Sequence, residues 1–341
     1  MEIFSDKNTL LSFLKKLPKA DKGAANFAKR YLSSLTKPKG SLGRLEDLVV
    51  WLAGWQGSKK KLSIDPAYCL IFCGNHGVTE EGVSAYPSEV TMQMVENFEN
   101  NGAAINHLCN VARINLIVNP IELDNPTKNI AIENAMNENE VLEAMRLGSN
   151  SIPDDAKIIL LGEMGIGNTT IASTISAASF GGTAKEWVGP GTGIKEKEIK
   201  LKTKIIDKAL LNNKKNSDPI TLFQKFGGRE LAAIVGAVIK CRIKKIPVIL
   251  DGFVCSASLS PFIKKFPNIL EHCQVAHLSS EPGHALLLNY FCIKPILDLK
   301  MGLGEGSGAA TALPIFRSAL AAYNNMATFE GAGVSRKKRL A

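Results

Sequence analysis

Six short apolar runs of five to seven residues set the strongest limit on how this chain can fold. They are continuous rather than alternating in polarity, which is typical of strands buried on both faces of a sheet. Strands that alternate with helices favour a parallel sheet with right-handed crossovers. The runs are 67–73, 112–118, 157–161, 246–250, 273–278 and 294–299, and the helical patterns between them include 89–109, 169–180, 196–211 and 229–243. The predicted fold class is therefore α/β, with a three-layer, Rossmann-like, six-stranded and mostly parallel sheet.

Both ends of the chain lack strand patterns and are helical in character. Residues 8–57 contain three helical stretches, and 308–329 form one long pattern rich in Ala and Leu. We expect 1–57 together with 308–341 to form a small helical domain, and 58–307 to form the α/β catalytic domain. Two polar stretches, at 134–141 and 212–217, are expected to be surface loops.

Composition excludes several classes of protein. The 341-residue chain is 45% hydrophobic, yet it contains no apolar run near the ~20 residues that a membrane span needs. The N-terminus has no uninterrupted apolar stretch, which argues against a secretory signal. Seven cysteines without a C-x-x-C pair indicate reduced thiols in a cytoplasmic protein. Five histidines show neither H-x-H nor H-x-x-x-H spacing, so we expect no metal site.

The net charge of +9 raises the question of a polyanionic partner. The lysines are spread over many segments and mixed with acids, so a solvated surface explains them better, and we expect no nucleic-acid partner. The one dense basic run, at 336–339, stands at the C-terminus, where disorder is common, and its role stays open.

Polar loops follow five of the six apolar runs. In an open parallel sheet, ligands bind beyond the carboxyl ends of the strands. The loops, rich in Gly, Ser and acidic residues, are 74–90, 162–170, 251–258, 279–284 and 301–310. One such loop is common, whereas five on one edge of a sheet predict a constructed pocket.

The segment GEMGIGNTT nearly matches the phosphate loop G-x-x-x-x-G-K-[ST], but Asn168 stands where the lysine should be. Gly165 and Gly167 let backbone amides approach an oxyanion, and a helix that starts near Thr169 offers its positive end. Without the lysine, and with Glu163 inside the loop, a monophosphate fits better than a triphosphate. Taken alone, the segment is explained equally well by a tight turn and a helix cap.

Glu305 lies between glycines in LGEGSG, directly before a helical pattern and without a nearby lysine or arginine. Apolar neighbours such as Leu303 can desolvate this carboxyl, which raises its pKa toward that of a useful base. An acid that merely favours a helix N-terminus is the alternative of equal weight.

Lys202 could reach back to a phosphate, although a solvated lysine explains its spacing better. His76 directly follows a strand and either contacts a ligand or holds a loop.

Nine segments, taken in chain order, closely resemble the nicotinate-nucleotide-dimethylbenzimidazole phosphoribosyltransferase family of cobalamin biosynthesis. They are 36–48, 74–94, 162–170, 188–193, 227–237, 247–253, 279–288, 303–314 and 326–335. The resemblance implies transfer of the 5-phosphoribosyl group of nicotinate mononucleotide to 5,6-dimethylbenzimidazole, giving nicotinate and α-ribazole 5′-phosphate. It implies no cofactor. It also implies a homodimer in which each small domain helps to close the pocket of its partner, with 37–44 nearby.

The resemblance also assigns roles to particular residues. It makes Glu305 the general base and puts Glu163 in the site, where its carboxylate would stabilise the transition state. The implied substrate-binding residues are Gly165, Gly167, Asn168, Thr169, Gly191, Lys202, Ser279, Gly306 and Ser307, and the implied base pocket is Tyr86, Met94, Leu303 and His76. Two positions depart from the family pattern: Asn75 stands where Asp is common, and Tyr86 stands where some relatives have Ser.

Four matters stay open at this point. The acceptor could be adenine, another benzimidazole or a phenolic compound, and the sequence does not separate de novo synthesis from salvage. A degenerate P-loop nucleotide-binding protein is a remote alternative, in which Asp251 would pass for the Mg²⁺-binding acid but the lysine is absent. A non-catalytic nucleotide sensor or a basic nucleic-acid-binding protein would leave Glu305 and Glu163 without a role.

Overall fold

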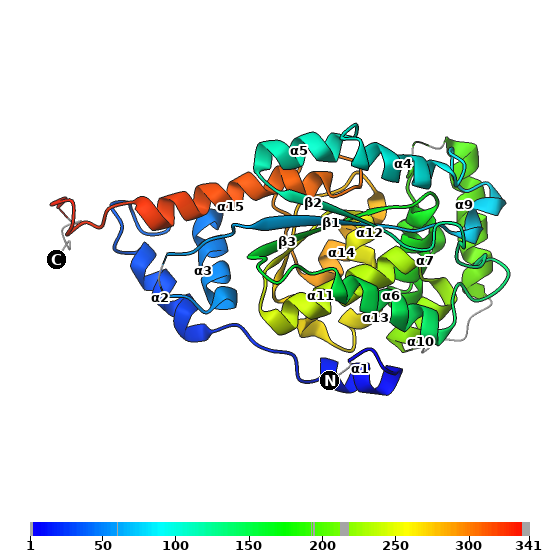
Figure 1. The fold of residues 1–341 in the computed structure, drawn as a ribbon, viewed down its shortest axis with the longest axis horizontal. Coiled ribbons are helices and arrows are strands. Elements are labelled where there is room, and N and C mark those ends of the chain that lie inside the picture. Colours follow the sequence, from blue (N-terminus) through cyan, green and yellow to red (C-terminus); the bar gives the residue numbers. More distant parts are fainter. Residues whose placement is uncertain (1–2, 60, 192, 194, 212–217, 336–341) are drawn as a thin grey trace.

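The computed structural model describes residues 3–335 except 60, 192, 194 and 212–217 (Figure 1). Within this part of the chain, five strands form one sheet in the order β2-β1-β3-β4-β5, and every neighbouring pair is parallel. The strands are β1 (Ala67–Cys73), β2 (Asn115–Pro120), β3 (Ile158–Met164), β4 (Val248–Leu250) and β5 (Cys273–Val275). The predicted parallel α/β sheet is confirmed.

The predicted number of six strands is wrong. The run at 294–299 makes a single parallel bridge, between Leu297 and His277, beside the edge strand β5. Pro295 has no N–H to donate to a strand ladder, and Leu299 is exposed rather than buried. The run therefore passes along the edge of the sheet without becoming a strand.

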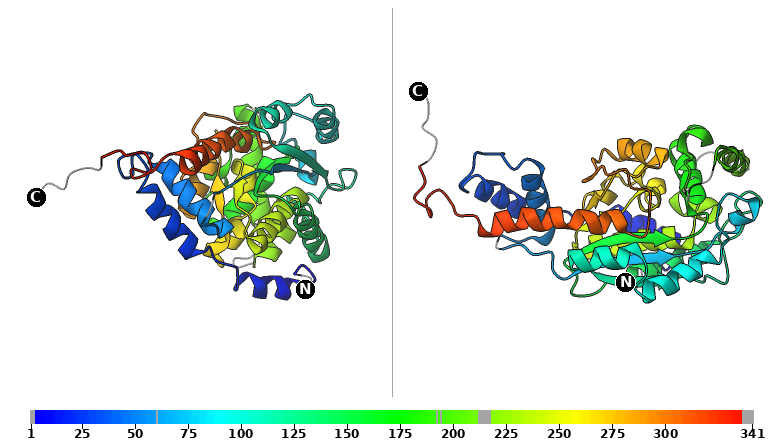
Figure 2. Two further views of the ribbon diagram at one scale, coloured as in Figure 1. Left: turned by 60° about the vertical axis from the view of Figure 1, so that its left-hand side comes forward. Right: turned by 90° about the horizontal axis from the view of Figure 1, so that it is seen from above.

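Helices cover both faces of the sheet because side chains of each strand alternate between two cores. Leu70 and Phe72 of β1 join one core, whereas Cys69 and Ile71 join the other. The first core is covered by α6 (Glu138–Asn150), α7 (Asn168–Phe180), α10 (Pro219–Phe226), α11 (Arg229–Lys244), α12 (Phe253–Ala257), α13 (Ser260–Ile263) and α14 (Pro282–Phe291). The second is covered by α4 (Val90–Glu99), α5 (Ala104–Ala112) and α15 (Ser307–Asn325). The result is the predicted three-layer arrangement (Figure 2).

The terminal helices divide between two places. Helices α2 (Lys22–Leu32) and α3 (Arg44–Gln56) pack together and join the core that contains Phe316 and Leu320 of α15. Helix α1 (Lys7–Leu14) lies away from them, against the α/β body, where its side chains join the first core (Figure 1). Helix α1 therefore does not share the core of α2 and α3, and the division of the chain into 1–57 with 308–341 and 58–307 stays a prediction.

Two further sequence expectations need correction. The helical pattern at 89–109 is split into α4 and α5 by a turn in which Asn101 has a φ of +57°. The expected loop at 134–141 overlaps the start of α6, because Asn137 caps this helix and the Glu140 carboxylate accepts the Asn137 N–H at 2.8 Å. The stretches 212–217 and 336–339 lie outside the described residues. None of the described helices is long and apolar enough to span a membrane.

Four further elements complete the described helices. They are α8 (Ala184–Trp187), α9 (Glu196–Leu211), and the 3₁₀ helices Gly77–Glu81 and Pro267–Leu270. Helix α9 has the bounds that the sequence predicted, and it packs beside α7 at the end of the molecule that holds the carboxyl ends of the strands (Figure 1).

Candidate active site

A cavity of about 480 Å³ lies beyond the carboxyl ends of β3 and β4. All five polar loops predicted from the sequence contribute to its lining, together with the first turns of α4. The lining residues are Tyr86, Val90, Met94, Glu163, Met164, Gly165, Ile166, Asn168, Thr169, Gly191, Asp251, Gly252, Phe253, Val254, His277, Ser279, Glu281, Gly302, Leu303, Gly304 and Glu305. Parallel strands bring their carboxyl ends to one edge, which is why loops so distant in sequence meet here.

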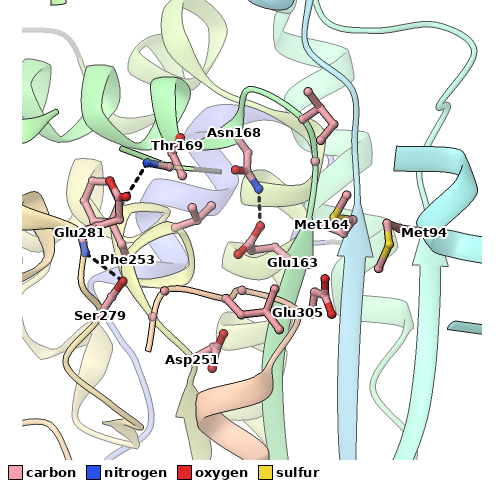
Figure 3. Close-up of a pocket in the computed structure, with 18 of the residues that line it drawn as sticks. Met94, Glu163, Met164, Asn168, Thr169, Asp251, Phe253, Ser279, Glu281 and Glu305 are labelled. Atoms are coloured by element: carbon pink, nitrogen blue, oxygen red, sulfur yellow. Dashed lines mark hydrogen bonds between the residues drawn. The ribbon is translucent and has the colours of Figure 1, made fainter. Parts of the chain in front are cut away.

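Glu163 is the penultimate residue of β3, lines the cavity and is only 6% exposed. Asn168, at the first position of α7, donates its side-chain amide to the Glu163 carboxylate (Figure 3). Burial raises the pKa of Glu163 to about 8, and the nearby carboxylates of Asp251, Glu230 and Glu305 act in the same direction. Asn168, which stands where a phosphate loop has its lysine, therefore forms a hydrogen bond with the Glu163 carboxylate.

Glu305 is held in an unusual backbone conformation beside Glu163. Its φ is +64°, and Gly306 follows with a φ of +79°. The Glu305 N–H donates to the Glu163 carbonyl oxygen at 3.0 Å, which docks this loop on the end of β3. Burial raises the pKa of the Glu305 carboxyl. A left-handed conformation costs a residue with a side chain roughly 1 kcal/mol, so the surrounding contacts must impose it.

Asp251 directly follows β4 and is almost fully buried next to these two acids. Burial raises its pKa to about 7, against the lowering effect of backbone N–H groups at the start of α15. The Nε2 atom of His277 lies 3.8 Å from Asp251 Oδ1, and burial lowers the pKa of this histidine. Sequence reasoning named Asp251 only as the Mg²⁺-binding acid of the P-loop alternative, and it missed His277. Asp251 directly follows one apolar run, and His277 lies near the end of another.

The other end of the cavity is formed around a buried lysine. Lys202 Nζ donates to Thr169 Oγ1 at 2.8 Å and to the Gly189 carbonyl at 3.4 Å. Burial lowers the pKa of Lys202 to about 8, and the Glu281 carboxylate opposes that shift. Glu281, which the sequence did not reveal, accepts the Gly191 N–H at 2.7 Å. This end of the site thus combines an amine, a hydroxyl and backbone amides.

Gly191 shows why the second glycine-rich loop can approach α7 so closely. Its φ is +54°, and a Cβ atom at this position would lie 2.7 Å from Thr169 Oγ1. A side chain here would push the loop away from the threonine that Lys202 contacts.

The structure brings most of the predicted site residues together. Ten of them line the cavity: Tyr86, Met94, Glu163, Gly165, Asn168, Thr169, Gly191, Ser279, Leu303 and Glu305. Gly167, Lys202, Gly306 and Ser307 lie behind this lining, where Ser307 Oγ donates to the Leu303 carbonyl at 2.9 Å. Tyr86 and Leu303 are 53% and 46% exposed, so that with Met94 they form an apolar rim.

His76 does not join the predicted base pocket. Its ring is buried outside the cavity, where Nε2 lies 2.8 Å from Glu230 Oε1. Asn75 turns away as well, since its side-chain amide donates to the Leu123 carbonyl at 3.0 Å. Both residues border a separate cavity of about 500 Å³. Within the described residues, no group of three or more His, Cys, Asp or Glu side chains is arranged to hold a metal ion.

The pKa of Glu163 leads to a prediction about stability. A carboxyl with an ordinary value of 4.5 that titrates near 8 when folded binds more protons in the folded state between these pH values. Its contribution to the free energy of unfolding therefore decreases as the pH rises from 5 to 8. Buried histidines have lowered pKa values and act in the opposite direction below pH 6.5, so a difference between two proteins is the proper measure.

We expect Glu163→Gln to gain thermal stability relative to the unchanged protein as the pH rises from 5 to 8. Melting temperatures measured at several pH values without ligand give this difference directly. If the melting temperatures of the variant and of the unchanged protein differ by the same amount at every pH from 5 to 8, Glu163 is not held protonated by its surroundings.

Known proteins match the chain over nearly its whole length. A family model described as Phosphoribosyltransferase matches residues 17–334. The nicotinate-nucleotide-dimethylbenzimidazole phosphoribosyltransferase of Novosphingobium aromaticivorans is 44% identical, with 98% of this chain and 99% of that protein covered. The enzyme of the same name from Mesorhizobium japonicum is 48% identical, with 94% and 96% covered. The crystal structure of CobT from Thermus thermophilus superimposes with a TM-score of 0.86 at 35% identity, covering 92% of this chain and 100% of that one.

Proposed function

This chain belongs to the nicotinate-nucleotide-dimethylbenzimidazole phosphoribosyltransferase family, and we propose that the buried acids at the edge of its sheet divide the chemistry of that reaction between them. The enzyme transfers the 5-phosphoribosyl group of nicotinate mononucleotide to 5,6-dimethylbenzimidazole in cobalamin biosynthesis. The observation that carries the division of roles is that Glu163 and Glu305 lie in one cavity, with Lys202 behind Thr169 at its other end.

The reaction needs one base and no general acid. The leaving nitrogen of nicotinate mononucleotide is a pyridinium, and it departs as the neutral ring nitrogen of nicotinate. The benzimidazole attacks the anomeric carbon through one ring nitrogen and must lose the proton on the other. Attack opposite the leaving group converts the β-glycosidic bond into an α-glycosidic bond.

Glu305 is the proposed base. A base works best when its pKa is close to the working pH, and burial shifts the Glu305 carboxyl in that direction. Leu303, two residues earlier in the same loop, belongs to the apolar rim that suits a flat aromatic acceptor. The proton that Glu305 removes from the benzimidazole nitrogen then passes to water when the product leaves.

Glu163 is the proposed electrostatic partner of the ribosyl group. The breaking glycosidic bond leaves positive charge on the sugar, and a fixed carboxylate beside that charge stabilises it. Burial raises the pKa of Glu163 to about 8, so without substrate this carboxyl is mostly protonated at neutral pH. The cationic pyridinium of the bound substrate favours the ionised form, so we infer that Glu163 loses its proton when this substrate binds.

The phosphate is proposed to bind at the opposite end, near Thr169, Gly191 and Lys202. Backbone amides at the start of α7 and the buried amine are donors of the kind that a single phosphate requires. A triphosphate would bring more negative charge toward Glu163 and Glu281, which disfavours the P-loop alternative.

We predict that Lys202→Met raises the KM for nicotinate mononucleotide by roughly tenfold to a hundredfold, which corresponds to one hydrogen bond to a charged group. The expected change in kcat is much smaller, because the amine lies at the far end of the cavity from Glu305. Steady-state kinetics with the nucleotide varied at saturating benzimidazole separate the two constants. A lower kcat at unchanged KM would place Lys202 in the chemical step.

We also propose that the protein acts as a homodimer. The rim residues Tyr86 and Leu303 remain about half exposed in a single chain, which suits closure of the cavity by a second copy. Light scattering on the purified protein is expected to give twice the chain mass, and a monomer with full activity would refute this.

The experiment that tests the reaction is incubation with nicotinate mononucleotide and a panel of bases, with the products identified by mass spectrometry. We expect α-ribazole 5′-phosphate and nicotinate with 5,6-dimethylbenzimidazole, and the relative yields with adenine and phenols measure how the rim selects the acceptor. ATP hydrolysis without any ribosyl transfer would favour the P-loop alternative.

A further inference from the structure

Asp251 lines the catalytic cavity, yet both of its carboxylate oxygens are engaged by the backbone. Oδ1 accepts the Ala309 N–H at 2.8 Å, and Oδ2 accepts the Gly306 N–H at 3.2 Å. These amides belong to the N-cap residue and the first turn of α15, which begins at Ser307, two residues after Glu305. We propose that Asp251 is a positioning residue that holds Glu305 in its catalytic place, an inference that rests on the role proposed for Glu305 above.

The start of α15 has no cap of its own. Its N-cap residue is Gly306, which has no side chain to accept the free N–H groups of the first turn. Asp251 supplies this cap from the end of β4, 55 residues earlier in the chain. A carboxylate at this position also interacts favourably with the positive end of the helix dipole.

Glu305 is consequently fixed from two directions. On one side its own N–H donates to the Glu163 carbonyl, and on the other side the next residue, Gly306, donates to Asp251. Asp251 is itself tied to the sheet, because its N–H donates to the Leu161 carbonyl of β3 at 3.2 Å. The left-handed backbone of Glu305 is thus held between β3 and β4, and the loss of one support frees the loop to relax.

A direct role in catalysis is the competing explanation, because Asp251 borders the cavity (Figure 3). The two explanations differ in how Asp251 depends on Glu305. A positioning residue acts only through the group that it positions, whereas a group that contacts the substrate contributes independently.

The test begins with Asp251→Asn, which keeps the shape but turns one acceptor oxygen into an NH₂ group that faces a backbone N–H. A misplacement of about 1 Å can cost roughly a hundredfold in rate, so we expect kcat to fall about tenfold to a hundredfold. The KM for nicotinate mononucleotide is expected to change less than threefold, roughly one hydrogen bond or less. Unchanged kcat in a folded variant would overturn the proposal.

Asp218→Asn is the matched control. Asp218 caps α10 by accepting the N–H groups of Ile220 and Thr221 at 3.0 and 3.2 Å, away from the cavity. It should lower the melting temperature while leaving kcat unchanged. Thermal unfolding and calorimetric binding of nicotinate mononucleotide report on the fold of each variant. Asp251→Ser, which keeps one acceptor oxygen, replaces Asp251→Asn if the latter does not fold, and the same kcat and KM changes are expected.

The decisive measurement adds Asp251→Asn to Glu305→Gln. If Asp251 acts through Glu305, the double variant has the same residual rate as Glu305→Gln alone. If Asp251→Asn lowers the residual rate of Glu305→Gln by the same factor as it lowers the rate of the unchanged protein, the positioning role is overturned in favour of direct contact with the substrate. Full activity of Glu305→Gln by itself would instead remove Glu305 as the base, and so would count against the proposed function.

Discussion

Glu305→Gln is expected to lower kcat roughly 10²- to 10⁴-fold, the range by which a general base contributes to proton transfer. Glutamine keeps the size of the side chain and also the hydrogen bond from the backbone N–H of residue 305 to the Glu163 carbonyl. It cannot take the proton from the benzimidazole nitrogen. Binding of nicotinate mononucleotide should be nearly unchanged, because its phosphate is proposed to bind at the other end of the cavity, near Thr169 and Lys202. Product formation under saturating substrates and calorimetric titration with the nucleotide measure the two effects separately.

Glu133→Gln is the control for this substitution, since Glu133 is exposed and distant from the lining of the cavity. It should leave both measurements unchanged. The Glu305 variant should also be at least as stable as the unchanged protein near pH 8, because burial already disfavours the charged form of this carboxyl. Near-normal turnover by Glu305→Gln would contradict its role as the base.

Gly162→Ala is expected to damage both stability and turnover severely. A Cβ atom at this position of β3 would lie 2.5 Å from the backbone nitrogen of Gly306 and 2.8 Å from the carbonyl carbon of Glu305. Backbone atoms cannot move aside as the end of a side chain can, so the loop that carries Glu305 must shift. We expect a loss of about 1–3 kcal/mol in the free energy of unfolding from the overpacking. A displaced base adds a decrease in kcat of roughly a hundredfold or more.

Gly54→Ala provides the comparison for this effect. Gly54 lies inside α3, and its Cβ atom would come no closer than 3.5 Å to any neighbouring atom. This substitution should leave kcat unchanged and should preserve or increase stability, because alanine favours a helix more than glycine does. Equal activity of Gly162→Ala and Gly54→Ala would mean that the Glu305 loop does not need its close contact with β3. Chemical denaturation and steady-state kinetics on both variants decide the matter.

The features of the site that could be predicted are those that depend on local sequence, namely the buried strands and the polar loops that follow them. Strands buried on both faces leave continuous apolar runs, so the ends of β1 and β4 could be located, and with them the loops that follow. Strand β3 continues to Met164, three residues beyond the predicted run. Glu163 and Glu305 lie among glycines near such strand ends, but the resemblance to the family was needed to assign them to the site, because the local pattern left alternatives of equal weight. Position 294–299 shows the limit of this pattern, since an apolar run with a proline beside an edge strand looks the same in sequence as a strand.

Contacts between distant segments were not predictable in the same way. Nothing near Asp251 in sequence reveals that its carboxylate caps a helix that starts at Ser307, because that partnership exists only after β4 and α15 are placed side by side. His76 shows the opposite case: it lies three residues after the end of β1, close to the other strand ends, but its ring contacts the buried carboxylate of Glu230 on α11. The direction of a side chain at a strand end depends on its packing partner, which local sequence does not specify.

A crystal structure of the enzyme with bound α-ribazole 5′-phosphate tests the central claim most directly. We expect a Glu305 carboxylate oxygen within hydrogen-bonding distance, about 2.6–3.2 Å, of the benzimidazole nitrogen that is not bonded to ribose. A product whose free ring nitrogen faces another side chain or open solvent, with the Glu305 carboxylate turned away, would contradict the account.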